Sequence, residues 1–229
     1  MSEAEDREGP LPALLFVFTA VTGVVDAVSY LALGRVFVAN MTGNVVFLGF
    51  AAAGAPDLSV GASLTAIAAF MIGALGGGRF AAASRHRARL LAVAVAVKIA
   101  AVAVALAVSL IGTMDDTHRY TLVVLLAAAM GLQNATARRL AVADLTTTVL
   151  TLTLTALAAD STLAGGSNPR PLRRLFAALW MLAGAVVGAV LVLNVSVAAA
   201  LAFTLLLLVG NAIAVFRWWG STDAWTASA

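Results

Sequence analysis

Uninterrupted apolar runs of about 20 residues constrain this chain more than any other feature, because an α-helix needs roughly that length to cross a bilayer. The run from Val195 to Phe216 contains no charged residue. Hydrophobic residues make up 62% of the chain and charged residues 11%, which excludes an ordinary soluble domain. The short alternating strands of an outer-membrane barrel are absent, so the sequence predicts an all-α membrane protein.

The chemistry-bearing residues exclude several classes of function. The chain has no cysteine, and its two histidines, His86 and His118, lie in polar connections. Disulfides, thiol catalysis and a histidine metal cluster in the membrane are therefore excluded, and no hydrolase or metalloprotease motif is present. The 14 basic residues are scattered and not interleaved with aromatic residues, despite a net charge of +3. We expect no enzyme activity, no cofactor, no metal and no nucleic-acid partner.

Apolar length divides the chain into eight hydrophobic segments. They are residues 11–33, 36–53, 59–78, 90–111, 120–137, 141–158, 172–193 and 195–216. Polar clusters interrupt two of them, at Asn40 to Asn44 and at Asp144 to Thr148. Such clusters disfavour a continuous span, so we expect the second and sixth segments to be broken or re-entrant.

The positions of the arginines separate six spans from eight, because basic residues accumulate in cytoplasmic connections. Eight crossings would place six arginines on one side and seven on the other. If the second and sixth segments return to the side they entered, eleven arginines share a face, and only Arg35 and Arg119 lie opposite. The eleven are Arg7, Arg79, Arg85, Arg87, Arg89, Arg138, Arg139, Arg170, Arg173, Arg174 and Arg217. Six spans with both termini in the cytoplasm are predicted, and eight spans are the alternative.

The segments form an internal repeat. Gly23 to Ala27 aligns with Gly131 to Ala135, and Val38 to Val46 aligns with Val142 to Leu150. Three spans and one broken segment per half give the halves opposite orientations, an inverted-topology repeat that many secondary transporters share. The expected division is a cytoplasmic N-terminal tail at 1–10, repeat one at 11–112 with broken segment 36–53, repeat two at 113–217 with broken segment 141–158, and a C-terminal tail at 218–229. The acidic first ten residues are unlike a cleaved signal peptide, so the first helix is expected to be retained.

Several motifs resemble those of the YoaK-like family of bacterial inner-membrane proteins, a domain of unknown function. They are Asp26-Ala27, Asn40 to Asn44, Gly131 to Ala135 and Thr146 to Thr151. The resemblance extends over roughly residues 11–216 and implies a bacterial plasma-membrane protein of a kind described as a small permease. Family members tend to carry a Thr-Gly pair where this chain has Thr147 and Thr148, so the two interrupted blocks are not expected to act identically.

Asp26 is a lone carboxylate inside the first predicted span, where a charge costs about 2.5–3.5 kcal/mol unless it is paired or hydrated. It can bind the substrate or couple transport to protons, or it can accept a structural hydrogen bond from a backbone amide. Its repeat partner Asn134, which follows Gln133, cannot titrate. This pair therefore carries at most one coupling proton.

The two interrupted blocks are the predicted substrate-binding elements. They supply Asn40, Thr42, Gly43 and Asn44 from the first repeat and Asp144, Thr146, Thr147 and Thr148 from the second. A fresh helix is expected to begin near Val45 or Val149, with Thr42 and Asn44, or Thr146 and Thr148, capping free backbone N–H groups. Two half-helix starts from opposite faces would frame one midplane site for a small polar or anionic solute. Ordinary polar contacts between helices are the alternative.

Lys98 interrupts the apolar run from Leu91 to Val108 and should not face lipid. It can pair with Asp26 or Asp144, or it can attract an anionic substrate. Asp144 can instead pair with Arg138 or Arg139. Asp26, Asp144 and Lys98 are thus the candidates for ion coupling.

Two small-xxx-small patterns, Gly73/Gly77 and Gly184/Gly188, indicate close helix packing within the chain or in a homodimer. Taken together, the sequence predicts a small permease in the bacterial inner membrane, either proton-coupled or uncoupled, with a small molecule or ion as substrate and the lipid bilayer around it. A non-transporting membrane scaffold or assembly factor is the alternative, although the short connections between the segments offer a partner protein little surface to bind.

Overall fold

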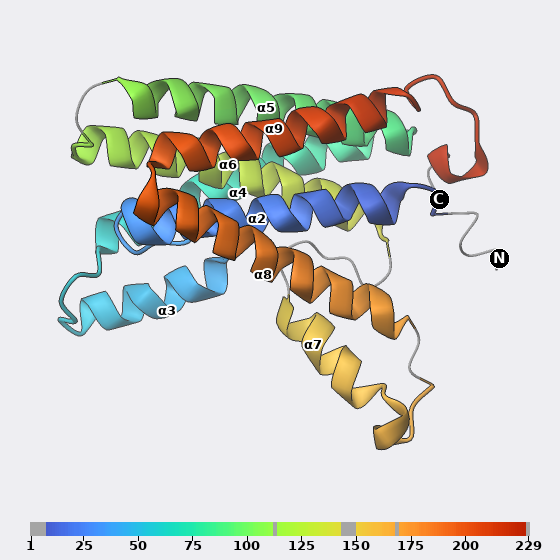
Figure 1. The fold of residues 1–229 in the computed structure, drawn as a ribbon, viewed down its shortest axis with the longest axis horizontal. Coiled ribbons are helices and arrows are strands. Elements are labelled where there is room, and N and C mark those ends of the chain that lie inside the picture. Colours follow the sequence, from blue (N-terminus) through green and yellow to red (C-terminus); the bar gives the residue numbers. More distant parts are fainter. Residues whose placement is uncertain (1–7, 112–113, 143–149, 168–169, 228–229) are drawn as a thin grey trace.

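The structure is a computed structural model that describes residues 8–111, 114–142, 150–167 and 170–227. Within these residues the chain forms eight α-helices and two short 3-10 helices (Figure 1). They are α2 (Leu11–Ala32), α3 (Met41–Ala52), α4 (Val60–Ala83), α5 (Arg87–Leu110), α6 (Asp116–Leu140), α7 (Leu150–Ala159), η1 (Thr162–Ala164), α8 (Pro171–Asn194), α9 (Val197–Phe216) and η2 (Ala224–Thr226).

Six of these helices are long and apolar enough to cross a membrane, namely α2, α4, α5, α6, α8 and α9. The other two are also apolar, but α3 has 12 residues and α7 has 10. Both are shorter than the roughly 20 residues that a crossing requires. The predicted fold class, an all-α membrane protein with six long helices and two short segments, is confirmed. Eight full spans do not fit these lengths.

Polar residues at the helix starts explain where several spans begin. The side chains of Ser59, Asp115 and Ser196 each accept a hydrogen bond from a backbone N–H three residues onward, at 3.1, 2.8 and 3.1 Å. These bonds satisfy donors that the first turn of a helix leaves free. Pro171 is the first residue of α8, a position where the missing N–H of proline removes no helical hydrogen bond.

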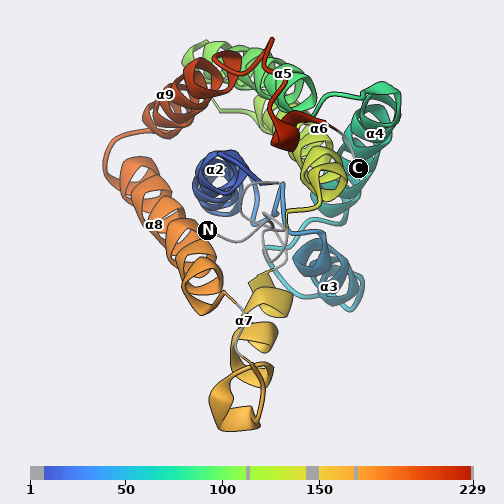
Figure 2. The same ribbon diagram turned by 90° about the vertical axis from the view of Figure 1, so that its right-hand side faces the viewer.

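Helix α2 lies at the centre of the bundle and the other long helices lie around it (Figure 2). In its most apolar stretch 72% of the residues are buried, compared with 17% in α8. The two most extensive helix pairs are α2 with α8 and α4 with α6. The first helix of each repeat therefore packs against the third helix of the other repeat.

Both of these pairs cross at glycine. Gly73 of α4 lies against the backbone of Ala128 in α6, and Gly184 of α8 lies against Ala20 in α2. A Cβ added at either glycine would come within 2.0 or 2.1 Å of the facing carbonyl oxygen. Such an approach of two backbones is possible only without a side chain.

The contacts correspond residue by residue between the two halves. Gly131 meets the Phe70 carbonyl as Gly23 meets that of Met181, and Gly77 faces Leu132 as Gly188 faces Val24. Gly23 and Gly131 are partners in the sequence repeat, as are Val24 and Leu132, so the duplication is present in the packing as well as in the motifs. The glycines of both small-xxx-small patterns contact the chain's own helices, and a homodimer would therefore need other surfaces.

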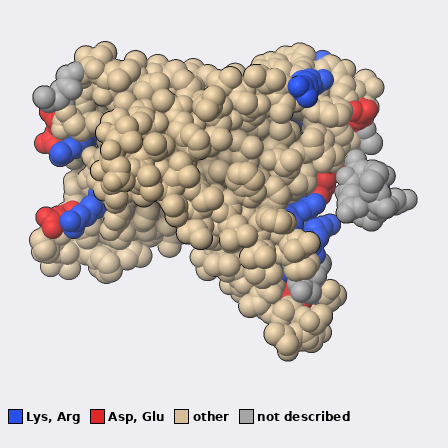
Figure 3. Space-filling view, in the orientation of Figure 1, with Lys and Arg blue, Asp and Glu red and all other residues tan. Residues whose placement is uncertain are grey.

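The two halves have opposite orientations. In Figure 1, α2 runs from right to left, whereas α6, its counterpart, runs from left to right. The α4–α5 connection, the end of α6 and the start of α8 lie at the right-hand end, near both termini. Charged side chains gather at the two ends of the bundle, and the middle is uncharged on the visible face (Figure 3). This uncharged belt is what a bilayer-spanning bundle requires.

The glycine crossings can be tested by Gly73→Ala. The added methyl group would clash with the Ala128 carbonyl, and we expect a loss of about 1–3 kcal/mol in the free energy of unfolding. Gly76→Ala on the same helix is the matched control, because nothing lies within 4 Å of the added atom. Denaturant titration in detergent micelles measures both variants. Equal stability of the two would contradict the crossing.

The topology can be tested with single cysteines, since the chain has none of its own. We expect Ser59→Cys and Ser196→Cys to react with an impermeant maleimide from the periplasmic side, because the α3–α4 and α8–α9 connections lie at the same end of the bundle (Figure 1). Ser84→Cys, between α4 and α5, is the control and should react only after the membrane is opened. Labelling of Ser59→Cys from the cytoplasm alone would instead favour eight spans.

Candidate functional site

The non-helical segment 33–40 leaves the end of α2 and returns along it. Asp26 Oδ1 accepts hydrogen bonds from the backbone N–H groups of Val38 at 3.2 Å and Ala39 at 2.9 Å. Asp26 lies six residues before the end of α2, so the segment returns by about 9 Å at 1.5 Å per residue. The Asp26 carboxylate is 7% exposed and serves as an acceptor for backbone that would otherwise be unsatisfied.

Asn44 holds the same segment from the other side. Its Oδ1 accepts from the Phe37 N–H at 2.8 Å, and its Nδ2 donates to the Phe37 carbonyl at 2.6 Å. The fully buried side chain of Asn44 thus satisfies both backbone polar groups of Phe37. The Phe37 ring lies so close to Gly43 that a Cβ there would come within 2.7 Å of it. Glycine is therefore required at the first turn of α3.

Helix α3 begins at Met41, and Asn40 is its N-cap, with Oδ1 accepting from the Gly43 N–H at 3.5 Å. The prediction that the helix begins near Val45 with Thr42 or Asn44 as cap is therefore wrong. Thr42 lies exposed in the first turn, and Asn44 is occupied by Phe37. The corresponding start in the second repeat, including Asp144, Thr146, Thr147 and Thr148, lies outside the described residues, and α7 is described from Leu150.

A cavity of ≈ 520 Å³ lies at the start of α3. Three of the four elements around it are helices far apart in the sequence: Phe70 comes from α4, Asn134 from α6 and Thr151 from α7. Segment 39–43, together with Val46 and Phe47, forms the remaining wall. In Figure 1 both short helices begin near the middle of the molecule. The starts of α3 and α7 therefore share one central cavity.

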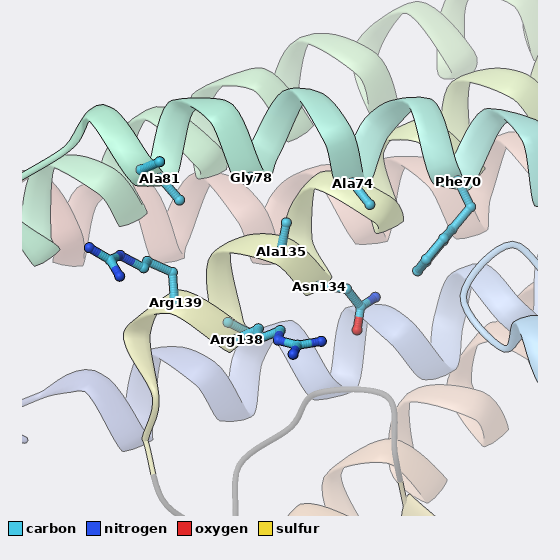
Figure 4. A pocket seen from close by; sticks show the side chains of 10 residues that line it. Phe70, Ala74, Gly78, Ala81, Asn134, Ala135, Arg138 and Arg139 are labelled. Atoms are coloured by element: carbon cyan, nitrogen blue, oxygen red, sulfur yellow. The ribbon is translucent and has the colours of Figure 1, made fainter.

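A second cavity of ≈ 940 Å³ lies between α4 and α6 and shares Phe70 and Asn134 with the first. Figure 4 shows these two residues at one end of the cavity and Arg138 and Arg139 toward the other. Both arginines lie in the last turn of α6. The α4 wall of this second cavity consists of Phe70 and small residues: Ala74, Gly78, Ala81 and Ala82. The two cavities together extend from the centre of the bundle to its arginine-rich end.

The predicted site residues divide into two groups. Asn40, Thr42, Gly43 and Asn134 line the central cavity. Asp26, Asn44 and Gln133 are buried behind it and hold backbone or other side chains in place. Asn134 also donates to the Met130 carbonyl at 2.9 Å. The structure thus brings together part of both repeats' motifs, and it assigns supporting contacts to the rest.

Lys98 is 1% exposed and does not face lipid, as expected. Its Nζ donates to Gln133 Oε1 and lies 4.1 Å from the centre of the Phe18 ring. Gln133 Nε2 donates in turn to Thr22 Oγ1 at 3.0 Å. This chain connects α5, α6 and α2. In the described residues no ion pair joins Lys98 to Asp26, so the suggested pairing of these two is not formed.

Sequence reasoning missed Thr151, Phe70 and the cavity role of Arg138 and Arg139. Thr151 is the repeat partner of Phe47, one position beyond the aligned block, and both line the central cavity. Extending the alignment by one residue would have found it. Phe70 carries no such signal, because a phenylalanine in an apolar helix is most often packing. The sequence indicated for Arg138 and Arg139 only a role in topology or a pairing with Asp144.

The fold, with six long apolar helices and two short ones in oppositely oriented halves, defines a multi-pass membrane protein. The chain belongs to the family described as "Protein of unknown function (DUF1275)", whose model matches residues 14–214. It is also similar to "UPF0700 transmembrane protein YoaK" of Bacillus subtilis (strain 168), with 33% identity over 151 residues. That match covers 64% of this chain and 65% of the relative's length. The resemblance to the YoaK-like family is thus confirmed. No solved structure matches the chain significantly.

The supporting role of Asn44 predicts a stability effect. Asn44→Leu would leave the Phe37 N–H and carbonyl without partners, and we expect the free energy of unfolding to fall by about 2 kcal/mol or more. Thr42→Val in the same turn is the control, because the exposed hydroxyl supports nothing described. Thermal unfolding in detergent compares them. An Asn44→Leu variant as stable as Thr42→Val would assign Asn44 to substrate rather than structure.

Asp26 allows a second comparison. Both backbone N–H groups bond the same oxygen, Oδ1, so Asp26→Asn can keep both bonds and should fold with wild-type stability. Asp26→Leu removes the acceptor and should lower the yield of folded protein, at a cost of about 1–3 kcal/mol for the buried donors. Monodispersity by size-exclusion chromatography and thermal unfolding report the difference. Similar behaviour of the two variants would show that the acceptor is unimportant.

Proposed function

We propose that the protein is a small permease, which moves a small polar or anionic solute through a site near the middle of the membrane. The observation that carries the proposal is the pair of connected cavities, which leads from the arginine-rich end to the starts of the two short helices. In this proposal α3 and α7 are re-entrant, each beginning inside the bilayer and returning to the face from which its segment entered. The protein is not an enzyme.

The walls of the central cavity support this role. Non-helical backbone at membrane depth is tolerated where protein buries it or where it lines a water-filled cavity. Segment 39–43 lines the cavity, and Asp26 and Asn44 satisfy the buried backbone just before it. The side chains of Asn40, Thr42 and Asn134 supply hydrogen-bonding groups there. A packing contact that excludes water would not need non-helical backbone together with polar side chains.

The inverted halves support alternating access. The wide cavity reaches Arg138 in the second repeat, whereas the aligned residue of the first repeat, Tyr30, stacks on Phe37 at 5.2 Å between ring centroids. Phe37 in turn stacks on Phe47, with centroids 5.6 Å apart. One end is thus open where the equivalent positions at the other end are closed. If repeat one adopted the open arrangement and repeat two the closed one, the central cavity would open to the opposite face of the membrane.

Localisation and coupling complete the proposal. The eleven-to-two arginine distribution favours the bacterial inner membrane with both termini in the cytoplasm. In this orientation the open cavity faces the cytoplasm. Proton coupling would use Asp26, Asp144 or Lys98, of which Asp26 and Lys98 are described and buried within the spans. Lys98 bonds the amide of Gln133, which immediately precedes the cavity residue Asn134.

Flux into proteoliposomes tests transport. Stopped-flow light scattering with urea, glycerol, sodium acetate and sodium phosphate gives the permeability relative to empty liposomes. We expect one class of solute to enter faster, and Thr42→Val to reduce that rate several-fold, because one cavity hydrogen bond contributes about 0.5–1.5 kcal/mol.

Thr121→Val is the matched control for this experiment. Its hydroxyl bonds the Thr117 carbonyl near the start of α6, away from both cavities. The control should transport like the wild type at equal incorporation. A protein that accelerates none of the four solutes would favour the non-transporting scaffold.

A further inference from the structure

The charge of the described residues around the two cavities is of one sign. Among these residues Arg138 and Arg139 are the only ionisable side chains that line either cavity. The other polar side chains on the described walls are amides and hydroxyls, from Asn40, Thr42, Asn134 and Thr151. The described walls therefore favour an anion over a cation.

The two arginines also differ from Arg173 and Arg174, which lie at the same end of the bundle. Arg173 pairs with Glu8 at 2.7 Å, and Arg174 pairs with Asp160 at 2.9 Å. Among the described residues, neither the Arg138 nor the Arg139 side chain has an ion-pair or hydrogen-bond partner. Two adjacent positive charges at the mouth of a low-dielectric cavity focus a positive potential into it and raise the local concentration of anions.

We propose that the cavity between α4 and α6 is an anion-binding site, in which Arg138 and Arg139 hold the charge of a phosphate or carboxylate group. Arginine is suited to this role, because its planar fork of donors matches both groups. This proposal deepens the proposed function by naming the charge of the solute. It rests on that function only for the transport of the bound anion, not for its binding.

Two sources can supply such a group. A free anion would pass the arginines and reach the central cavity. An anionic lipid would place its headgroup on the arginines and its acyl chain along the apolar α4 wall of Ala74, Gly78, Ala81 and Ala82. The chemistry at the guanidinium groups is the same in both cases, so the experiment needs one arm for each source.

The experiment uses the full chain in nanodiscs. In the first arm the lipid is purely zwitterionic, and the unfolding temperature is measured during titration with sodium phosphate and with sodium acetate at constant ionic strength. In the second arm no phosphate or acetate is added, and zwitterionic discs are compared with discs that contain phosphatidylglycerol. A ligand that binds the folded state raises the unfolding temperature.

The test variant is Arg138→Gln/Arg139→Gln, and the matched control is Arg79→Gln/Arg85→Gln. Arg79 and Arg85 are exposed, lie near the same end of the bundle and line neither cavity. We expect the test variant to weaken half-saturation by about tenfold or more, since a charge-assisted hydrogen bond contributes about 1.5–3 kcal/mol. The control should bind like the wild type, and Arg138→Lys/Arg139→Lys should retain part of the affinity.

Each outcome decides a point. A phosphate or acetate response lost in the test variant alone supports a free-anion site, and a phosphatidylglycerol response lost in that variant alone supports a headgroup site. No response in either arm, or equal loss in test and control variants, overturns the anion site. The proposed function is judged separately. Binding without flux would refute transport and keep the site, whereas flux without an anion or headgroup response in either arm would refute the site and keep transport.

Discussion

A short stretch of non-helical backbone inside an apolar bundle is the constraint on which the rest of this structure depends. The middle of segment 33–40 is buried against α2, and its N–H groups need acceptors from the protein. Asp26 supplies one oxygen to two of them, and Asn44 pairs with both polar groups of Phe37. With these bonds in place, α3 can begin alongside α2 and not beyond its end. Without them the central cavity would have no wall on this side.

The same constraint explains why the two repeats are not identical in chemistry. Asp26 is bound to backbone, whereas its partner Asn134 lines both cavities. Tyr30 belongs to an aromatic stack, whereas its partner Arg138 lies at the mouth of a cavity. Each half keeps the glycine contacts that fix the helix crossings, while the side chains near the short helices have diverged. The two repeats thus share their helix crossings but line the cavities with different side chains, and both described arginines on the cavity walls come from α6.

The sequence predicted what depends on length and composition. The long spans follow from apolar runs, and the glycine pairs at 73/77 and 184/188 indicate close crossings that the structure contains. It named Thr42 and Asn44 as caps where the structure has Asn40, because all three are capping residues within five positions. The partner of Lys98 was not predictable either, since it depends on how α5 and α6 are rotated about their axes. Gln133, one residue before Asn134, turned out to face Lys98.

The central place of α2 has a consequence for how the chain is made. This helix is made before α8, yet α8 is its most extensive packing partner, and it also packs against α9. Gly23 and Gly184, which form that crossing, are separated by most of the chain. Until the C-terminal third has been inserted, the side of α2 that bears Gly23 must rest against lipid or against an insertion chaperone. Assembly of the core is therefore a late event in synthesis, and chains that stop before α8 would contain all of repeat one without the helix that covers its first span.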